Sequence, residues 1–237
     1  MGLMVYAVCR TGAIDPAELP TGCRGGRVHA ICTERTTALF SPLDEPVARA
    51  SEADFASFDG VIARAHALTA TLPIRFGAFF SDDGLLSRAM RHADTRLVDG
   101  LQAVDGRSEV SVTIPAPSPV VTRPARVASP APVEAAFEGS AARSLPVAAP
   151  RDPVRTSEVE PQYVLRHHLA ALHEIAERVV IEDPVASAAG GLMRCMVRDQ
   201  DLCGFREAFE DARQEHGFVG RIGEPSPCYH FATHALA

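Results

Sequence analysis

A proline-rich segment at residues 115–153 sets the strongest limit on how this chain folds. It holds half of the chain's 18 prolines, and no hydrophobic period runs through it. Proline fixes φ and has no N–H to donate, so such a segment builds neither a β-ladder nor a regular helix. We therefore predict an extended, mobile linker at residues 115–158, between domains at residues 1–114 and 159–237. A proline-rich ligand for a partner's aromatic groove is the alternative interpretation.

The residues before this segment begin with strand patterns. Apolar runs at residues 3–9, 27–32 and 36–41 predict three strands. After the second predicted helix, residues 108–114 alternate between polar and apolar side chains and predict a last strand.

Two helices are expected in the same part of the chain. Ser51 opens a capping sequence, Ser-Glu-Ala-Asp, and apolar residues follow it at three- and four-residue spacing. The second helix carries an apolar stripe over residues 85–101 and ends before Gly106. Its apolar residues are Leu85, Leu86, Ala89, Met90, Ala93, Leu97 and Leu101.

Residues 72–84, with the sequence LPIRFGAFFSDDG, combine several signals. The phenylalanine-rich run predicts a buried strand, and Ser81, Asp82 and Asp83 supply capping oxygens for the helix that follows. Arg75 is the exception within the apolar run, because a guanidinium must reach solvent, a carboxylate or a partner. A solvent-facing Arg75 is the simpler interpretation.

The order of these elements predicts a ferredoxin-like α/β sandwich with an added N-terminal hairpin. We expect both helices on one face of a sheet that mixes parallel and antiparallel pairs. Beyond the linker, a helix at residues 160–181, a strand at 190–197, a helix at 199–216 ended by Gly217, and a strand at 218–223 predict a small α+β domain. The fold class expected for the whole chain is α+β.

Charge and composition exclude several functions. The net charge of −7 argues against nucleic acid as the main partner, because binding phosphates needs a concentrated basic face. Lys and Asn are absent, which excludes a Schiff-base lysine, a P-loop lysine and N-glycosylation. The first residues do not read as a signal peptide, and no apolar run is long enough to span a bilayer. We expect a soluble cytoplasmic protein.

Cysteine and histidine patterns give no metal or catalytic signature. Four of the six cysteines lie in apolar strand-like or helix-like patterns, which predicts buried free thiols in a reducing compartment. The spacing of His167, His168 and His173 does not place two rings on one helix face, so we expect no metal and no cofactor. A Gly-x-Ser-x-Gly motif is absent, while Cys–His catalysis between spatial neighbours stays open.

Four stretches resemble, in order, segments of the gas vesicle protein F/L family. Residues 72–83 are similar to the family's L-P-x-R-F-G-T-x-F-x-D segment, and residues 4–8 match its short opening strand. Residues 162–166 are similar to a Y-L-x-x-R/K helix start, and residues 223–231 to a G-P-W-P-P-Y-S/H-F ending. Ala78 stands where the family usually has Thr, Glu224 and Ser226 replace prolines, and the chain has no Trp. A divergent member is expected.

The resemblance implies a non-enzymatic accessory protein, associated with gas vesicles in the cytoplasm. Such a protein binds the hydrophobic major shell subunit and assists gas vesicle nucleation and assembly, together with other accessory proteins. We expect neither nucleic acid nor membrane as a partner. The candidate partner-binding residues are Arg75, Phe76, Gly77, His66, Pro225, Pro227, Tyr229 and Phe231.

Two questions stay open on the residues themselves. His66 either contacts the loop of the 72–77 strand or is a partly buried histidine bonded to backbone. The alternative function is a small α/β enzyme or ligand-binding protein with a site at the interdomain cleft. A deep polar pocket with converging His and Cys favours that alternative, and a flat apolar groove favours the accessory protein.

Overall fold

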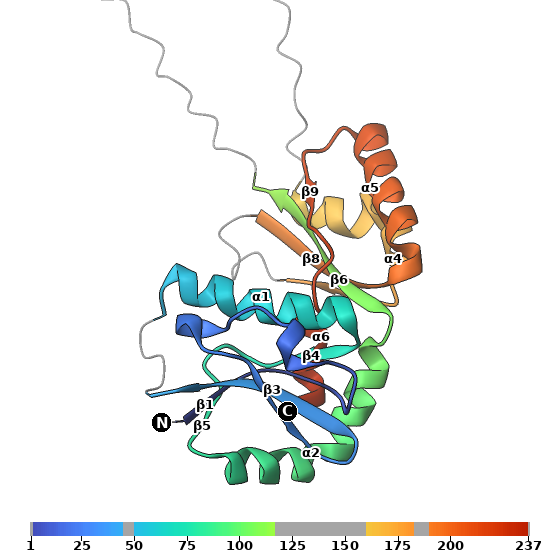
Figure 1. Cartoon of the computed structure of the whole chain (residues 1–237). Helices are drawn as coiled ribbons and strands as arrows, with labels where there is room; N and C mark the ends of the chain where they lie inside the picture. The colour runs from blue at the N-terminus through green and yellow to red at the C-terminus, as the bar shows by residue number, and fades with distance from the viewer. Residues whose placement is uncertain (1, 45–49, 117–159, 183–189, 237) are drawn as a thin grey trace, which may run out of the picture.

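The computed structural model describes residues 2–44, 50–116, 160–182 and 190–236, with side chains up to Ala232. The chain forms two antiparallel sheets with helices packed against them (Figure 1). This arrangement confirms the predicted α+β class. The predicted linker lies outside the described residues from position 117 onward, so its extended, mobile state stays a prediction.

The first sheet is built around β1, Gly2–Arg10, whose first eight residues are buried. Its strand order is β2-β3-β1-β4, and β5 also pairs with β1. Every pair in it is antiparallel, so the expected mixture of parallel and antiparallel pairs is wrong. The other strands are β2, His29–Cys32; β3, Thr36–Leu43; β4, Thr71–Pro73; and β5, Phe79–Phe80.

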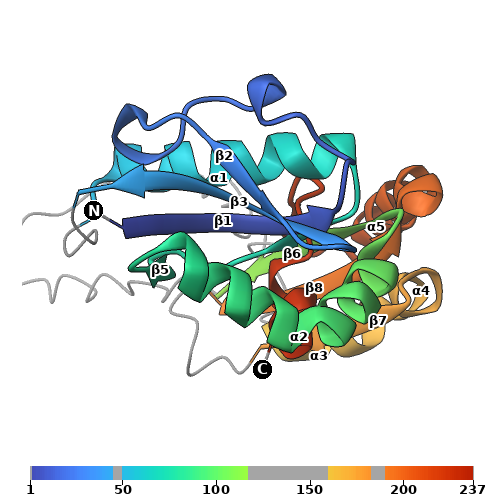
Figure 2. The same ribbon diagram turned by 60° about the horizontal axis from the view of Figure 1, so that its bottom comes forward.

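Helices cover both faces of this sheet. On one face, α1, Glu52–Leu68, packs Phe58 and Ile62 into a cluster with Met4 and Tyr6 of β1. On the other face, α2, Asp83–Val104, packs into a cluster with Leu3, Val5 and Val8 of the same strand. Figure 2 shows β1 running between the two helices. The expectation that both helices share one face is wrong, because β1 is apolar on both sides and each side needs cover.

The predicted caps of the first two helices are confirmed. At α1 the Ser51 side chain accepts from the backbone N–H of Asp54, and the Asp54 carboxylate accepts from the N–H of Ser51, as a capping box requires. At α2 the Asp82 side chain accepts from the N–H of Leu85 at 2.8 Å. Both caps follow from residues within one turn of each other.

The strand predicted across residues 72–80 is interrupted. β4 ends at Pro73 and β5 begins at Phe79, and the residues between them leave the ladder. The N–H of Ala78 donates to the carbonyl of Arg75 at 3.1 Å, and Gly77 has a φ of 88°. A positive φ is readily adopted by glycine, so Gly77 makes this turn possible.

The second sheet has the order β7-β8-β6-β9. Its longest ladder joins β6, Arg107–Pro115, to β8, Gly190–Arg198, in register from Arg107↔Arg198 to Pro115↔Gly190. Residues 108–114 were expected to complete the first sheet, and that expectation is wrong. Their partner strand lies beyond the proline-rich segment, a pairing that local pattern does not reveal. The remaining strands are β7, Arg178–Ile181, and β9, Arg221–Ile222.

The first helical stretch after the proline-rich segment is shorter than predicted at its C-terminal end. The single helix expected at residues 160–181 ends at Ile175, and Arg178–Ile181 form β7 instead. The β-branched residues of β7 suit a strand better than a helix. The helical elements are η1, Pro16–Glu18; η2, Cys23–Gly25; α3, Pro161–Tyr163; η3, Val164–His168; α4, Ala170–Ile175; η4, Asp199–Asp201; α5, Leu202–His216; and α6, Tyr229–Leu236.

The C-terminal tail returns to the first sheet. Phe231 and Ala232 of α6 are buried in the same cluster as Leu86 and Met90 of α2, and Met196 of β8 joins them. The two sheets therefore share part of one hydrophobic core. Among the described helices, none is long and apolar enough to cross a membrane.

Candidate functional site

A groove of about 750 Å³ opens at the edge of the first sheet, beside α2. Its lining is almost entirely apolar. The groove walls come from three parts of the chain: β1, the 73–80 region and α2, joined by residues of α1 and by Tyr229 of the tail. The α2 residues that line it are Leu86, Ala89, Met90, Ala93 and Leu97.

Phenylalanines extend the apolar surface at the rim of the groove. The ring of Phe76 lies 4.3 Å from that of Phe55 and 5.0 Å from that of Phe58, measured between centroids. Phe58 is buried, whereas Phe55 remains 47% exposed. Large exposed aromatic side chains beside an apolar groove are typical of surfaces that receive a partner.

Two charged residues line the groove, and they differ in their pairing. Asp59 of α1 accepts a hydrogen bond from the Tyr229 hydroxyl at 3.0 Å. Arg75 is exposed, and its guanidinium makes no hydrogen bond or ion pair with any residue that the structure describes. Arg75 faces solvent, as the simpler interpretation expected, but it lies in the turn between β4 and β5 and not on a strand. Among the residues that the structure describes, Arg75 is thus an unpaired cation beside the apolar part of the lining.

The tail residues predicted as partner-binding take different positions. Tyr229 lines the groove, and burial, reinforced by the nearby Asp59 carboxylate, raises the pKa of its hydroxyl. Pro227 is buried, and Phe231 is only 4% exposed beneath the Arg178 guanidinium, which lies 5.2 Å from its ring. Pro225 is half-buried and does not line the groove.

The 72–83 segment and the C-terminal tail, which carry the family-like motifs, thus meet at one groove. Residues 2–233 match the model of the family described as gas vesicle synthesis protein GvpL/GvpF. The chain belongs to this family. Its role is therefore that of an accessory protein in gas vesicle formation. A comparison with curated proteins finds no match.

Two solved structures share the fold. The crystal structure of the gas vesicle protein GvpF from Anabaena sp. PCC7120 is 18% identical, with a TM-score of 0.73 over 98% of this chain and 95% of that chain. The crystal structure of GvpF from Microcystis aeruginosa is 17% identical, with a TM-score of 0.71 over 98% of both chains. At these identities the likeness concerns the fold.

His66 of this GvpL/GvpF family member lies away from the groove, between α1 and the second sheet. Its Nε2 is 3.2 Å from the hydroxyl of Ser108, which in turn donates to Oδ1 of Asp199 at 2.7 Å. Burial lowers the pKa of His66, and the Asp199 charge opposes that effect. His66 is partly buried, as one sequence interpretation expected, but the partner of its Nε2 is a side chain of β6 and not backbone, and sequence reasoning had placed β6 in another sheet.

The order of this trio does not match nucleophilic catalysis. In a catalytic triad the histidine stands between the serine and the carboxylate and accepts the serine proton. Here the Ser108 hydroxyl donates its hydrogen bond to Asp199 and not to the histidine, and Ser108 is only 5% exposed. The trio is therefore better described as a polar contact joining α1 to the second sheet.

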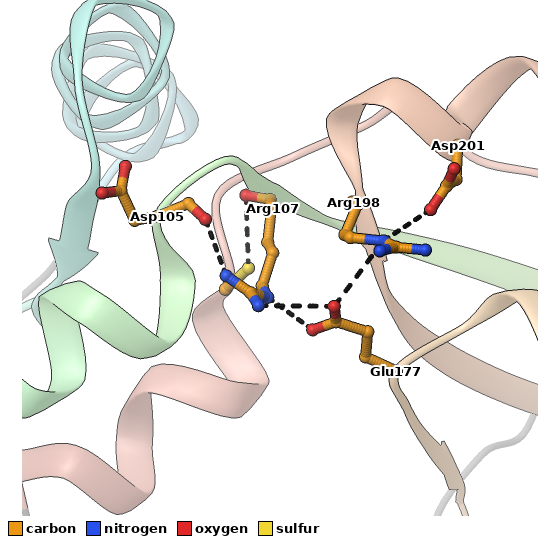
Figure 3. A network of polar contacts seen from close by, with 6 residues as sticks. Asp105, Arg107, Glu177, Arg198 and Asp201 are labelled. Carbon is orange, nitrogen blue, oxygen red and sulfur yellow. Dashed lines mark hydrogen bonds and ion pairs between the residues drawn. The ribbon is translucent and has the colours of Figure 1, made fainter.

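A second polar junction joins the start of β6 to the residues just before β7 and at the end of β8, two other strands of the second sheet (Figure 3). Arg107 pairs with the carboxylate of Glu177 and donates to the carbonyl of Asp105 at 2.7 Å. Arg198 lies 3.7 Å from Glu177 and donates to Asp201 at 2.6 Å. Hydrogen bonding to Glu177 raises the pKa of Arg107. Every charge in this cluster has a partner, so it reads as a structural junction.

The tail is held by Glu109, a residue that sequence reasoning missed. Its side chain on β6 is 3% exposed, pairs with Arg194 at 3.1 Å and accepts from the backbone N–H of His230 at 2.8 Å. Its backbone exchanges two hydrogen bonds with Ser226. A buried carboxylate at the first turn of α6 favours the helix there. The only sequence signal was a glutamate within a strand that alternates between polar and apolar residues.

The histidines near the start of the second unit make local contacts. His173 Nε2 lies 3.1 Å from the carbonyl oxygen of Leu165, and the ring of His168 stacks on that of His216 with centroids 4.2 Å apart. Tyr163 packs edge-on against His168. Within the described ranges, no group of three or more His, Cys, Asp or Glu residues has metal-binding geometry.

Proposed function

We propose that this GvpL/GvpF family protein binds the hydrophobic major shell subunit of the gas vesicle in the groove beside α2. By holding the subunit there, it assists gas vesicle nucleation and assembly, in the cytoplasm and in association with the vesicle. Other gas vesicle accessory proteins act together with it. The observation that carries this proposal is the apolar groove of about 750 Å³ lined by the family-like 72–83 segment.

The physical basis is burial of apolar surface. Each Å² of apolar surface that the shell subunit buries in the groove stabilises the complex by about 25 cal/mol. The groove and the exposed ring of Phe55 supply a complementary surface, with few polar groups that binding would have to desolvate. Such a surface shields the subunit from self-association until it is added to the wall.

The alternative of an enzyme or ligand-binding site at the interdomain cleft has weaker support. The groove lies at the edge of the first sheet, and neither histidine nor cysteine lines it. The His66, Ser108 and Asp199 trio lies nearer the junction of the two sheets. Its serine stands between the histidine and the carboxylate, an order of hydrogen bonds that does not suit nucleophilic catalysis.

The test is co-expression of the tagged chain with the major shell subunit, followed by affinity capture. Ala89→Glu places a carboxylate in the groove, since Ala89 is exposed and lines it. Ala103→Glu is the matched control, an exposed alanine on the same helix that does not line the groove. Phe76→Asp is a poorer choice, because the Phe76 ring packs on buried Phe58.

We expect the wild type and Ala103→Glu to capture the subunit equally, and Ala89→Glu to capture at least about tenfold less, because docking would bury the new carboxylate under an apolar partner. Circular dichroism confirms that each variant is folded. Equal capture by both alanine variants rejects the groove as the site. No capture by the folded wild type rejects the binding function itself.

A further inference from the structure

We propose that the partner enters the groove as an amphipathic α-helix, and not as a strand added to the sheet, with an acidic side chain against Arg75. This inference rests on the proposed function, namely that the groove receives the shell subunit. It specifies the form and the charge of the segment that binds.

The sheet edge beside the groove is closed to an added strand. The N–H of Ile74 donates to the carbonyl of Tyr6 at 2.8 Å, and the N–H of Val5 donates to the carbonyl of Ala78 at 3.1 Å. These bonds occupy the edge groups of β1 with the chain's own backbone. The outer edge that remains is β4, with three residues, and β5, with two, separated by the turn at Gly77. An added strand needs a longer continuous edge.

The side chains of α2 form a trough suited to a helix. The residues that line the groove recur at three- and four-residue spacing from Leu86 to Leu97. With a rise of about 1.5 Å per residue, this stripe is about 16 Å long, the length of about three turns of a docked helix. Ala89 and Ala93 lie between the larger side chains and let a second backbone approach closely.

The neighbouring surface already receives a helix from the chain itself. α6 packs on α2 and β4, and its residues Phe231 and Ala232 are buried in the cluster that contains Leu86 and Met90. Tyr229, the first residue of α6, also lines the groove. The groove therefore continues an apolar interface between helices, and a docked helix extends that packing.

The positive charge of Arg75 at the rim of the groove favours an acidic residue beside the apolar face of the docked helix. Asp59 already accepts from Tyr229, whereas Arg75 is exposed and has no partner among the residues that the structure describes. A carboxylate beside the apolar face of the partner helix supplies that partner. The chain as a whole carries a net charge of −7, so a preference for an acidic segment comes from this local cation.

The test uses synthetic peptides of about 18 residues tiled across the shell subunit, which compete with the full-length subunit for the immobilised whole chain. We expect one tile with an apolar helical face and an acidic residue to compete. A proline at its centre weakens competition at least about tenfold, because proline breaks the helix. Replacing its acidic residue by Lys weakens competition about two- to fivefold, the effect of an exposed ion pair.

Charge reversal supplies the control. Arg75→Glu is expected to bind the Lys-substituted peptide better than the original peptide. Arg91→Glu, at an exposed position of α2 that does not line the groove, is expected to leave the preference unchanged.

Each other outcome overturns the inference. Equal competition by the proline-substituted peptide shows an extended occupant, and an unaltered preference in Arg75→Glu removes the charge assignment. Sedimentation that shows self-association of the wild type, lost in Ala89→Glu, assigns the groove to a second copy of the chain. If the full-length subunit is captured but no helical tile competes, the helical form of the partner is rejected and the proposed function stands. Absence of capture rejects the proposed function.

Discussion

The hydroxyl of Tyr229 donates a hydrogen bond to Oδ1 of Asp59 at 3.0 Å, across 170 positions of the sequence. Asp59 lies on α1 and Tyr229 opens α6, and both residues line the same groove. The bond therefore fixes the tail against the first unit at the place where we propose that a partner binds.

Tyr229→Phe removes this bond and keeps the ring. We expect a loss of about 0.5–1.5 kcal/mol in the free energy of unfolding, the usual net value of one hydrogen bond. Urea denaturation measures it. In a double-mutant cycle with Asp59→Ala, the second substitution is expected to add little to the first. Fully additive losses contradict a direct interaction between the two side chains.

Glu109→Ala removes the buried acceptor that holds the start of α6. We expect a loss of roughly 1–3 kcal/mol, because the N–H of His230 loses its partner and Arg194 keeps only its bond to Glu182. Glu109→Gln retains an acceptor of the same size, so its loss is expected to be smaller. Chemical denaturation compares them.

The control for Glu109 is Glu210→Ala. Glu210 pairs with Arg213 on the exposed face of α5, where both side chains are 45% exposed. An exposed pair of this kind contributes at most about 1 kcal/mol. Equal losses for Glu109→Ala and Glu210→Ala argue against an anchoring role for Glu109.

The stability of the protein is expected to fall as the pH drops below about 6.5, the pKa of an unfolded histidine. Burial lowers the pKa of His66 in the folded state, so in this window the unfolded state binds more protons and acid favours unfolding. His66→Gln is expected to reduce the slope of the unfolding free energy between pH 7 and 5.5. His92→Gln, at an exposed position of α2, is the control.

The unfolding free energy is measured only between pH 7 and 5.5, above the pH range in which carboxylates change it. Hydrogen bonds lower the pKa values of Asp54 and Asp82, and their contributions are lost only at more acid pH. His168, whose pKa burial also lowers, contributes with the same sign as His66 and stays in both variants. An unchanged slope in His66→Gln places the titrating group elsewhere.

Thiol reactivity is expected to divide the cysteines into two classes. Cys32 and Cys203 are exposed, whereas Cys9, Cys23, Cys195 and Cys228 are buried. Burial raises the pKa of Cys9, Cys195 and Cys228 to about 12, so few thiolates form near neutral pH.

We expect Ellman's reagent at pH 8 to modify two thiols rapidly and the remaining four only after unfolding in guanidinium. The double variant Cys32→Ser, Cys203→Ser should show no rapid phase. More than two rapid thiols in the wild type contradicts the burial of the other four.

Local signals predicted the features that short stretches of chain decide. The capping box at Ser51, the cap at Asp82 and the left-handed Gly217 after α5 each depend on residues within one helical turn. The prediction that most cysteines are buried free thiols is also confirmed. Apolar neighbours in the sequence favour burial of the cysteine beside them.

Partners across the chain were predicted less well. The strand pattern of β6 was predicted, but its assignment to the first sheet was wrong, because β6 forms its backbone hydrogen bonds with β8. The two faces of β1 were not distinguished from the sequence, so α1 and α2 were expected on one side. The apolar stripe of α2 was predicted, but not that part of it lines a groove.

The sequence by itself determined the α+β class, the main helices and the family, because helix caps, apolar periods and short motifs depend on neighbouring residues. Only the tertiary structure decided that Arg75 and Tyr229 line one groove, that Glu109 holds the tail and that His66 meets the second sheet. These contacts join residues far apart in the chain. They form because the folded chain must bury its apolar side chains and pair its buried polar groups, and the residues that do this are distant in sequence. No local sequence pattern indicates such pairs.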